Sequence, residues 1–373
     1  MDLLTPATPE ELAYALRESA SADKRIELIG KGSKRRAGGA SGAADVQITT
    51  ARLDRVLQYE PKDLTVSVQP GLPYAQFTEM LAKDGYMVPL DPPFAANATL
   101  GGAISANSSG PRRRVYGSAR DLVIGMQFAT LEGKLIQTGG MVVKNVAGLD
   151  MGKLLIGSLG TLAAITVLNF KLIPKPHGSR TFVFEFPDLR DAIALRDKVI
   201  RSVLQPVAID LLNPAAAGRK GWVLAIGVNG NEAVLRRYTR ELSGGAMIED
   251  EEERAFWHLV QEFTARFVAV NPEGAVVRSS VPLAFVGEAV GKLPGAVVAR
   301  AGNGVIYSHV TNATQAGAAL RVGKALMEFG PASREASLDM WPNVDSGFAV
   351  MQRIKEMFDP KKLLNRGRFY GRL

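Results

Sequence analysis

The chain has 373 residues, of which 46% are hydrophobic and 22% charged, and its formal net charge is +8 at pH 7. A chain of this length buries a sizeable core and is typical of two domains. Because it contains no cysteine, disulfides, thiolate catalysis and a cysteine-ligated iron–sulfur cluster are excluded.

The sequence predicts alternating short strands and helices up to residue 175. Thr8-Pro-Glu-Glu11 predicts a helix start, because it combines a hydroxyl cap, a proline at the first helical position and a glutamate three residues after the cap. An apolar face then carries this helix to about Ser19. The further elements expected here are strands over 25–29, 46–48, 64–68 and 162–171, a helix over 74–83, and a hairpin of strands 122–129 and 134–137.

Pro174 and Pro176 indicate a linker, and we place a domain boundary between residues 175 and 176. Strands and helices joined by short loops follow, which is typical of an antiparallel α+β domain. The elements expected here are strands over 181–186, 207–212, 222–228, 246–248, 275–280, 296–301 and 305–309, and helices over 188–203, 232–242, 251–267, 313–328 and 346–357.

Small and glycine-rich segments are concentrated in one part of the chain. Residues 101–160 hold 12 of the 38 glycines, which is about twice their proportional share. Glycine tolerates positive φ and lets backbone N–H groups approach a phosphate without a Cβ between them. We therefore expect backbone in this region to lie directly against a ligand.

Two loops could hold a phosphate. Gly30-Lys-Gly-Ser-Lys34 offers backbone amides and further donors on Lys31, Ser33 and Lys34, but Arg35 stands where a dinucleotide-binding Gly-x-Gly-x-x-Gly motif would end. Taken alone, such a loop is more often a plain turn.

The second loop is Thr99-Leu-Gly-Gly102, whose two successive glycine amides could face a pyrophosphate. Asn107 or Ser108 could bond further ligand oxygens. The alternative is a tight strand-to-helix connection.

Basic residues cluster at 31–36 and at 112–114. They indicate either an anionic partner, such as a pyrophosphate, an acidic subunit or a nucleic acid, or two solvated loops. No nucleic-acid-binding pattern accompanies them, so we expect no nucleic acid.

In order and spacing, these loops resemble the FAD-binding domain of the vanillyl-alcohol oxidase and p-cresol methylhydroxylase (PCMH) type, over about residues 1–175. Gly110-Pro-Arg-Arg, Lys144-Asn-Val-Ala-Gly and Gly157-Ser-Leu-Gly-Thr-Leu more closely resemble the FAD-binding E-type subunits of bacterial glycolate oxidases. The resemblance implies that the first loop and Thr99–Gly102 hold the pyrophosphate, and that residues 144–165 line the isoalloxazine and adenine ends. The cofactor-binding residues it implies are Gly30, Lys31, Gly32, Ser33, Lys34, Pro70, Gly71, Pro89, Thr99, Leu100, Gly101, Gly102, Ala106, Asn107, Gly110, Gly117, Asp121, Lys144, Asn145, Gly148, Asp150, Gly157, Gly160 and Ile165.

The sequence departs from relatives of this type at two places. Many of them tether the flavin through a histidine in the first loop or a cysteine; this chain has neither, so we expect non-covalent FAD. Related catalytic subunits carry His-x-Gly-Asp-Gly-Asn-x-His at a metal and substrate site, where this chain has Arg300-Ala-Gly-Asn-Gly-Val-Ile-Tyr307. Arginine is neither a metal ligand nor a base at neutral pH, so we expect no metal.

Few residues remain as catalytic candidates. Arg278 and Arg300 could bind a carboxylate, with Tyr307 beside them, and His309 could face the flavin; ion pairing and packing are the alternatives. His177 and His258 fit solvated or packed positions better.

The end of the chain resembles the return segment of this family. Phe358-Asp-Pro-x-x-Leu-Leu-Asn-Arg-Gly-Arg has Arg366 where relatives usually have the proline of Asn-Pro-Gly. We expect residues 336–373 to pack on the FAD domain.

The expected fold class is α+β: a two-part PCMH-type FAD-binding domain at 1–175, an antiparallel-sheet cap domain at 176–335, and the returning segment. The resemblance implies the FAD-binding subunit of a glycolate oxidase complex that oxidises glycolate, a small 2-hydroxy acid, to glyoxylate. Its partners would be a D-type flavin subunit with the main substrate site and an F-type iron–sulfur subunit. The alternatives are a self-sufficient FAD-dependent 2-hydroxy-acid oxidoreductase and a non-catalytic scaffold subunit.

The sequence also predicts where the protein resides. No apolar run approaches the about 20 residues of a membrane-spanning helix, and the first residues lack a signal-peptide pattern. We therefore expect a cytoplasmic protein, which a complex could hold at the inner face of the cell membrane.

Overall fold

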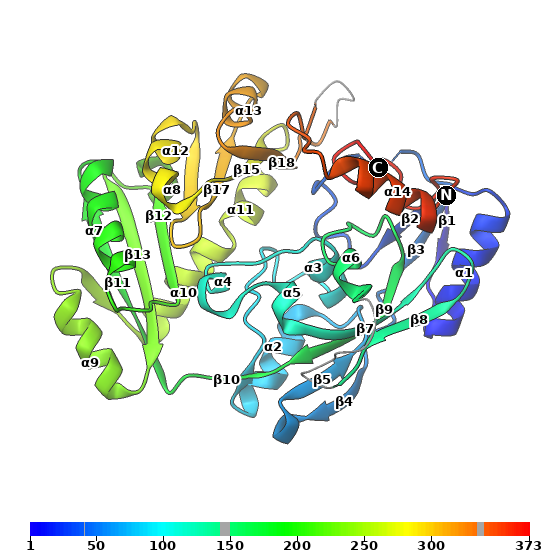
Figure 1. Ribbon diagram of the computed structural model, residues 1–373, viewed down its shortest axis with the longest axis horizontal. Coiled ribbons are helices and arrows are strands. Elements are labelled where there is room, and N and C mark those ends of the chain that lie inside the picture. The colour runs from blue at the N-terminus through cyan, green and yellow to red at the C-terminus, as the bar shows by residue number, and fades with distance from the viewer. Residues whose placement is uncertain (41, 142–149, 334–338) are drawn as a thin grey trace. The chain divides into compact units, whose positions relative to one another are not determined.

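The computed structural model describes residues 1–40, 42–141, 150–333 and 339–373, and it divides into two compact units (Figure 1). Unit 1 comprises Met1–Ser109, Ser118–Lys175 and Val344–Leu373, and unit 2 comprises Gly110–Gly117 and Pro176–Asn343. The short excursion Gly110–Gly117 therefore groups with the second half of the chain. None of the helices in the described ranges has the length and apolar character needed to cross a membrane.

Unit 1 contains a small parallel sheet covered by a helix. Its strands are β1 (Asp2–Leu4), β3 (Val46–Thr49) and β2 (Ile26–Ile29), in that order. Helix α1 (Pro9–Ser21) begins as the sequence predicts, because the Thr8 side chain accepts the Glu11 N–H at 3.1 Å. Its buried face packs into a core with β2, β3 and the neighbouring sheet.

The second sheet of unit 1 is antiparallel and has the order β4-β5-β9-β7-β8. Its strands are β4 (Val56–Glu60), β5 (Thr65–Val68), β9 (Ala164–Lys171), β7 (Val123–Ala129) and β8 (Leu135–Gly139). The remaining elements of this unit are β6 (Tyr86–Met87), β10 (Ile173–Pro174), the 3-10 helix η1 (Pro61–Asp63), α2 (Tyr74–Lys83), α3 (Leu100–Ser105), α5 (Ala119–Leu122), α6 (Gly152–Leu155) and α14 (Phe348–Phe358). Apolar residues of α2, α3 and α5 share one core with β5, β7 and β9.

Unit 2 is built on one eight-stranded antiparallel sheet of order β14-β11-β13-β12-β16-β17-β15-β18. The strands are β14 (Ala246–Ile248), β11 (Gly178–Phe186), β13 (Trp222–Gly230), β12 (Ala208–Leu212), β16 (Ala296–Arg300), β17 (Val305–Val310), β15 (Ala275–Ser280) and β18 (Lys324–Phe329). The helices are α4 (Arg113–Tyr116), α7 (Leu189–Arg201), α8 (Pro214–Ala217), α9 (Glu232–Glu241), α10 (Asp250–Gln261), α11 (Phe263–Val270), η2 (Leu283–Phe285), α12 (Val286–Lys292) and α13 (Ala313–Ala319).

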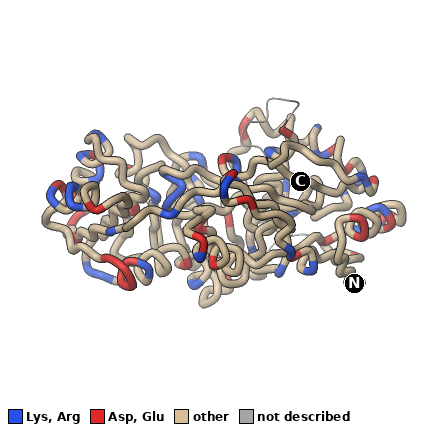
Figure 2. The backbone as a smooth tube through the Cα atoms, turned by 90° about the horizontal axis from the view of Figure 1, so that it is seen from below, with Lys and Arg blue, Asp and Glu red and all other residues tan. Residues whose placement is uncertain are grey.

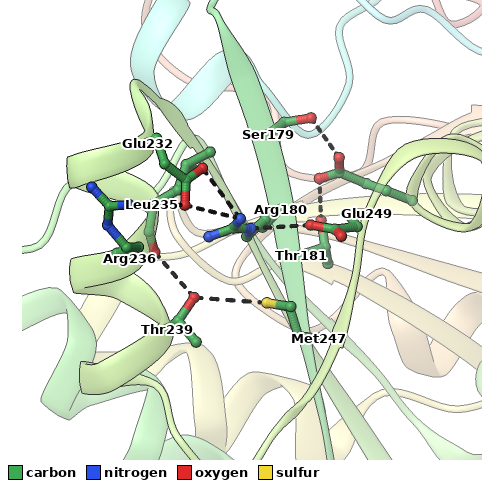
Figure 3. A network of polar contacts seen from close by, with 10 residues as sticks. Ser179, Arg180, Thr181, Glu232, Leu235, Arg236, Thr239, Met247 and Glu249 are labelled. Carbon is green, nitrogen blue, oxygen red and sulfur yellow. Dashed lines mark hydrogen bonds and ion pairs between the residues drawn. The ribbon is translucent and has the colours of Figure 1, made fainter.

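Helices lie on both faces of this sheet. A Cβ at Gly227 would touch Trp257 of α10, whereas a Cβ at Gly230 would touch Val234 of α9. Residues three apart in a strand point to opposite faces, so α9 and α10 cover opposite faces. Arg180 of β11 forms ion pairs with Glu232 at the start of α9 and with Glu249, the residue just before α10 (Figure 3).

The predicted α+β class with an antiparallel second domain is confirmed. Two predicted helices are wrong in extent. The helix expected over 251–267 is two helices that meet at Glu262. The helix expected over 313–328 ends at Ala319, and its second half is strand β18, because Gly323 turns the chain at φ +68° and the alternately buried residues that follow suit a sheet.

Candidate cofactor site

Unit 1 contains an open cavity with about 840 Å³ of empty volume, which includes the open solvent at its mouth. Its walls come from four segments that are far apart in the sequence: the loop after β2, the start and end of α3, the loop before β9, and the C-terminal segment. The lining residues are Glu27, Leu28, Ile29, Gly30, Lys31, Gly32, Ser33, Lys34, Arg35, Ala37, Thr50, Pro70, Thr99, Gly101, Gly102, Ser105, Ala106, Leu159, Gly160, Ile165, Asn365 and Arg368.

The loop after β2 presents free backbone donors to this cavity. In the part of the chain that the structure describes, the N–H groups of Lys31, Gly32 and Ser33 donate to no protein acceptor. Gly32 adopts φ +71°, a conformation that favours glycine. Successive free N–H groups form a concavity that binds anions, so this loop fits a pyrophosphate.

The charge of the lining matches the same ligand. Lys31, Lys34, Arg35 and Arg368 line the cavity, and Glu27 is paired with Arg35 at 3.7 Å. Lys34 is only 8% exposed, and its Nζ lies 5.5 Å from the centre of the Phe94 ring. The excess of cations stabilises a bound dianion.

The Thr99–Gly102 loop contributes in a different way from the one expected. The Gly102 N–H donates to the Thr99 hydroxyl at 3.3 Å, and the Gly101 N–H donates to the Pro70 carbonyl at 2.7 Å. Both amides therefore have acceptors within the protein. Gly101 instead allows close packing, since a Cβ there would lie 2.6 Å from Pro70 Cβ. Gly30 of the loop after β2 does the same, since its Cβ would lie 2.3 Å from Thr99 Oγ1.

The loop before β9 closes the far wall. Its Leu159 N–H donates to the Ser105 carbonyl at 2.8 Å, which joins it to the end of α3. Next to this junction, the Oδ1 atom of Asn107 is buried and has no hydrogen-bond partner within the described part of the chain, but Asn107 does not line the cavity. The open amides and the basic lining fit FAD.

The residues that the resemblance implied fall into three groups. Those on the cavity are Gly30, Lys31, Gly32, Ser33, Lys34, Pro70, Thr99, Gly101, Gly102, Ala106, Gly160 and Ile165. Those that do not line it are Gly71, Pro89, Leu100, Asn107, Gly110, Gly117, Asp121, Asp150 and Gly157. Lys144, Asn145 and Gly148 lie outside the described residues.

Several residues in the second group have another structural role. Leu100 is fully buried in the core, Asp121 accepts the Ser118 N–H in a capping box at the start of α5, and Gly110 and Gly117 belong to unit 2.

Sequence reasoning missed the C-terminal contribution to the cavity. Asn365 accepts the Leu28 N–H at 2.8 Å and donates to the carbonyls of Leu28 at 3.2 Å and Leu159 at 3.0 Å. The return segment marked this region in the sequence, but only as a packing element.

In unit 2 the two candidate arginines have carboxylate partners. Arg278 Nε lies 3.0 Å from Glu328, and Arg300 is ion-paired with the buried Asp210. The Arg300 guanidinium also lies 5.8 Å from the centre of the Tyr307 ring. Burial raises the pKa of Tyr307 above its usual value, so this phenol stays protonated near neutral pH.

His309 is sealed in the interior of unit 2 at 2% exposure. Its Nδ1 lies 2.9 Å from the Ala296 carbonyl, which only accepts, so Nδ1 carries the proton; Nε2 then accepts from the Thr264 hydroxyl at 2.9 Å. Burial lowers the pKa of His309 to about 4. The structure thus gives His309 a packing role within unit 2, whereas His177 and His258 are exposed.

Two family models match the sequence. The FAD binding domain matches residues 3–139, and the C-terminal domain of FAD linked oxidases matches residues 342–369. The second match covers the segment that supplies Asn365 and Arg368 to the cavity.

Curated relatives agree with these models. The chain is 29% identical over 327 residues to glycolate oxidase subunit GlcE of Escherichia coli (strain K12), covering 85% of both chains. It is 28% identical over 213 residues to glycolate oxidase subunit GlcD of Bacillus subtilis (strain 168), covering 57% of this chain and 45% of the relative.

A solved structure shows the same fold. p-Cresol methylhydroxylase with substrate bound superposes with a TM-score of 0.76 at 14% identity, over 99% of this chain and 88% of the other. The fold, the two family models and the relatives agree with a cavity suited to FAD: the chain is similar to FAD-linked oxidases in its N-terminal and C-terminal segments and is an FAD-dependent oxidoreductase.

Proposed function

We propose that this protein is the FAD-binding subunit of a glycolate oxidase complex that oxidises glycolate to glyoxylate. The observation that carries the proposal is the similarity to the subunit GlcE, which extends over 85% of both chains. Unit 1 is then the FAD domain, closed by the C-terminal segment, and unit 2 is the cap domain.

FAD, when bound, accepts and releases the electrons of the reaction. The open amides of Lys31, Gly32 and Ser33 bind its pyrophosphate, and Lys34 balances the charge. With no cysteine in the chain and no histidine in the first loop, the cofactor is held by these contacts without a covalent bond.

The main substrate site lies on a partner flavin subunit. Support comes from unit 2, where Arg300 and Tyr307 replace the histidines of the hydroxy-acid motif and where Arg278 and Arg300 already bind carboxylates. His309 has both nitrogens bonded. A glycolate oxidase therefore needs a D-type subunit for substrate and an F-type iron–sulfur subunit for electron transfer. The complex works in the cytoplasm, at the inner face of the membrane.

The test is to purify the chain alone and with D-type and F-type subunits. We expect the chain alone to be yellow, to release FAD on denaturation and to leave glycolate untouched in a dye-linked assay. Full turnover requires all three subunits. Glycolate oxidation by the chain alone would instead support the self-sufficient enzyme, and a colourless protein that takes up no FAD would support the scaffold.

A further inference from the structure

The C-terminal segment pairs with β2 at one isolated parallel bridge. The Ile26 N–H donates to the Leu363 carbonyl, and the Asn365 N–H donates to the Ile26 carbonyl, both at 2.9 Å. Leu364 pairs with Ile26 in a parallel bridge and is fully buried in the core that α1 shares with β2 and β3. The end of the chain is thus joined to the sheet from which the first cofactor loop emerges.

A buried ion pair anchors this segment to the loop before β9, which forms one wall of the cavity. Lys355 on α14, 2% exposed, donates to Asp359 at 2.6 Å, to the Thr161 carbonyl at 2.8 Å and to the Leu364 carbonyl at 3.0 Å. Asp359 also accepts the N–H groups of Leu363 and Leu364. All three ammonium protons are used, so the pair fixes one geometry.

Two side chains extend from this anchor to the walls of the cavity. Asn365 joins Leu28, near the end of β2, to Leu159 in the loop before β9. Arg368 donates to the carbonyls of Lys34 and Arg35, both at 2.6 Å, at the end of the first loop. A Cβ at Gly160 would lie 2.8 Å from Asn365 Nδ2, so the fit of this side chain is close.

We propose that residues 355–368 are a positioning clasp. The clasp holds the loop after β2 and the loop before β9 in their FAD-binding arrangement before the cofactor arrives. Asn365 and Arg368 are its positioning residues, and the pair Lys355–Asp359 is its anchor. Loops held in place lose less conformational freedom on binding, so the clasp raises FAD affinity beyond what it adds to stability. The inference rests on the FAD site of the proposed function.

The experiment uses the full chain, stripped of FAD and reconstituted. Arg368→Met removes both donors, Arg368→Lys keeps one, and Asn365→Ala removes the bridge between the loops. Lys361→Ala is the control, because Lys361 lies in the same segment but is 59% exposed and pairs only with the exposed Asp23. The readouts are the FAD dissociation constant, the unfolding midpoint of the apoprotein, and amide exchange at Leu28 and residues 30–35.

We expect the dissociation constant to rise about tenfold or more in Arg368→Met and Asn365→Ala, because the hydrogen bonds that hold the loops are lost. Arg368→Lys should recover part of the affinity, and the control should stay within about twofold. Exchange at Leu28 should quicken in Asn365→Ala, because its acceptor is lost.

FAD affinity within about twofold of wild type in folded Arg368→Met and Asn365→Ala would overturn the clasp, even if their apoproteins are less stable. If Asn365→Ala does not fold, the comparison of Arg368→Met with Arg368→Lys decides alone. Both variants should fold, because the Arg368 side chain is only half-buried. FAD binding is measured without glycolate or partners, so a failure of the three subunits together to oxidise glycolate would overturn the proposed function and leave the clasp standing.

Discussion

At the scale of single residues, the walls of the cavity depend on glycines whose backbone lies against neighbouring side chains. Gly30 and Gly101 are required because other atoms lie where their Cβ would be: Thr99 Oγ1 at 2.3 Å and Pro70 Cβ at 2.6 Å. The sequence identified these positions as permissive backbone, but it could not show that their neighbours in space are other members of the same site.

Gly30→Ala should weaken FAD binding by about tenfold, because the new methyl group displaces Thr99 from the cap of α3 and overpacking costs about 1–3 kcal/mol. Flavin titration of the apoprotein measures the effect. Gly42→Ala is the matched control, since no atom lies within 4 Å of that Cβ. Equal affinity of the two variants would contradict the close-packed wall.

His309 should make the protein less stable in acid. Its folded pKa of about 4 lies below the usual 6.5, so between these values the unfolded chain binds a proton that the folded ring does not. The free energy of unfolding should therefore fall from about pH 6.5 to about pH 4, by up to about 3 kcal/mol.

Urea unfolding at pH 8, 6 and 4.5 tests this dependence. His309→Gln should lower stability at every pH but flatten the decline, whereas His177→Gln, at an exposed position, should keep the wild-type slope. Parallel curves for wild type and His309→Gln would show that this ring does not cause the decline.

At the scale of elements, polar contacts hold helices to the large sheet of unit 2. Glu253 of α10 is 6% exposed and accepts hydrogen bonds from the hydroxyls of Ser179 and Thr181 on β11. Thr181 in turn accepts from Trp257 at 2.7 Å. The helix and strand are therefore joined by one connected network, part of which Figure 3 shows.

Glu253→Ala should destabilise the protein by about 1–3 kcal/mol, because the buried Thr181 hydroxyl loses its acceptor. Glu252→Ala changes the neighbouring, exposed residue and should shift stability by no more than about 0.5 kcal/mol. The midpoints of urea unfolding compare the two. Similar midpoints would mean that the network contributes little to holding α10.

The sequence predicted most elements because their periodicity and caps are local signals, as for α1 and the hairpin of β7 and β8. The prediction was wrong at β18, because the helix expected from residue 313 was continued past Gly323 on the helix-forming composition of the residues that follow. Whether Lys324–Phe329 is helix or strand depends on the open edge of β15, with which it pairs.

At the scale of the whole molecule, basic and acidic residues are interspersed along the backbone of both units (Figure 2). The cavity nevertheless carries an excess of positive charge, because Lys31, Lys34, Arg35 and Arg368 line it against the single carboxylate of Glu27. A concave site with such an excess attracts an anionic ligand, and the range of the attraction depends on the salt concentration.

The association rate of FAD with the apoprotein should therefore fall about fivefold between 20 mM and 500 mM salt. Riboflavin is the control ligand, since it shares the flavin ring but lacks phosphate, and its rate should change little. Stopped-flow fluorescence measures both. The same salt dependence for the two ligands would exclude steering by these cations.

The sequence by itself indicated a phosphate-bearing ligand, because glycine-rich loops are local features, and it led us to expect a cofactor without a covalent tether. Only the tertiary structure decided which donors are free. The amides of Gly101 and Gly102 have internal acceptors, whereas those of Lys31, Gly32 and Ser33 are open. Only the fold, likewise, brought Asn365 and Arg368 to loops more than 200 residues away in the chain. Hydrogen bonds between such distant segments leave no periodic trace in a sequence, since they arise from the packing of elements that each form for separate local reasons.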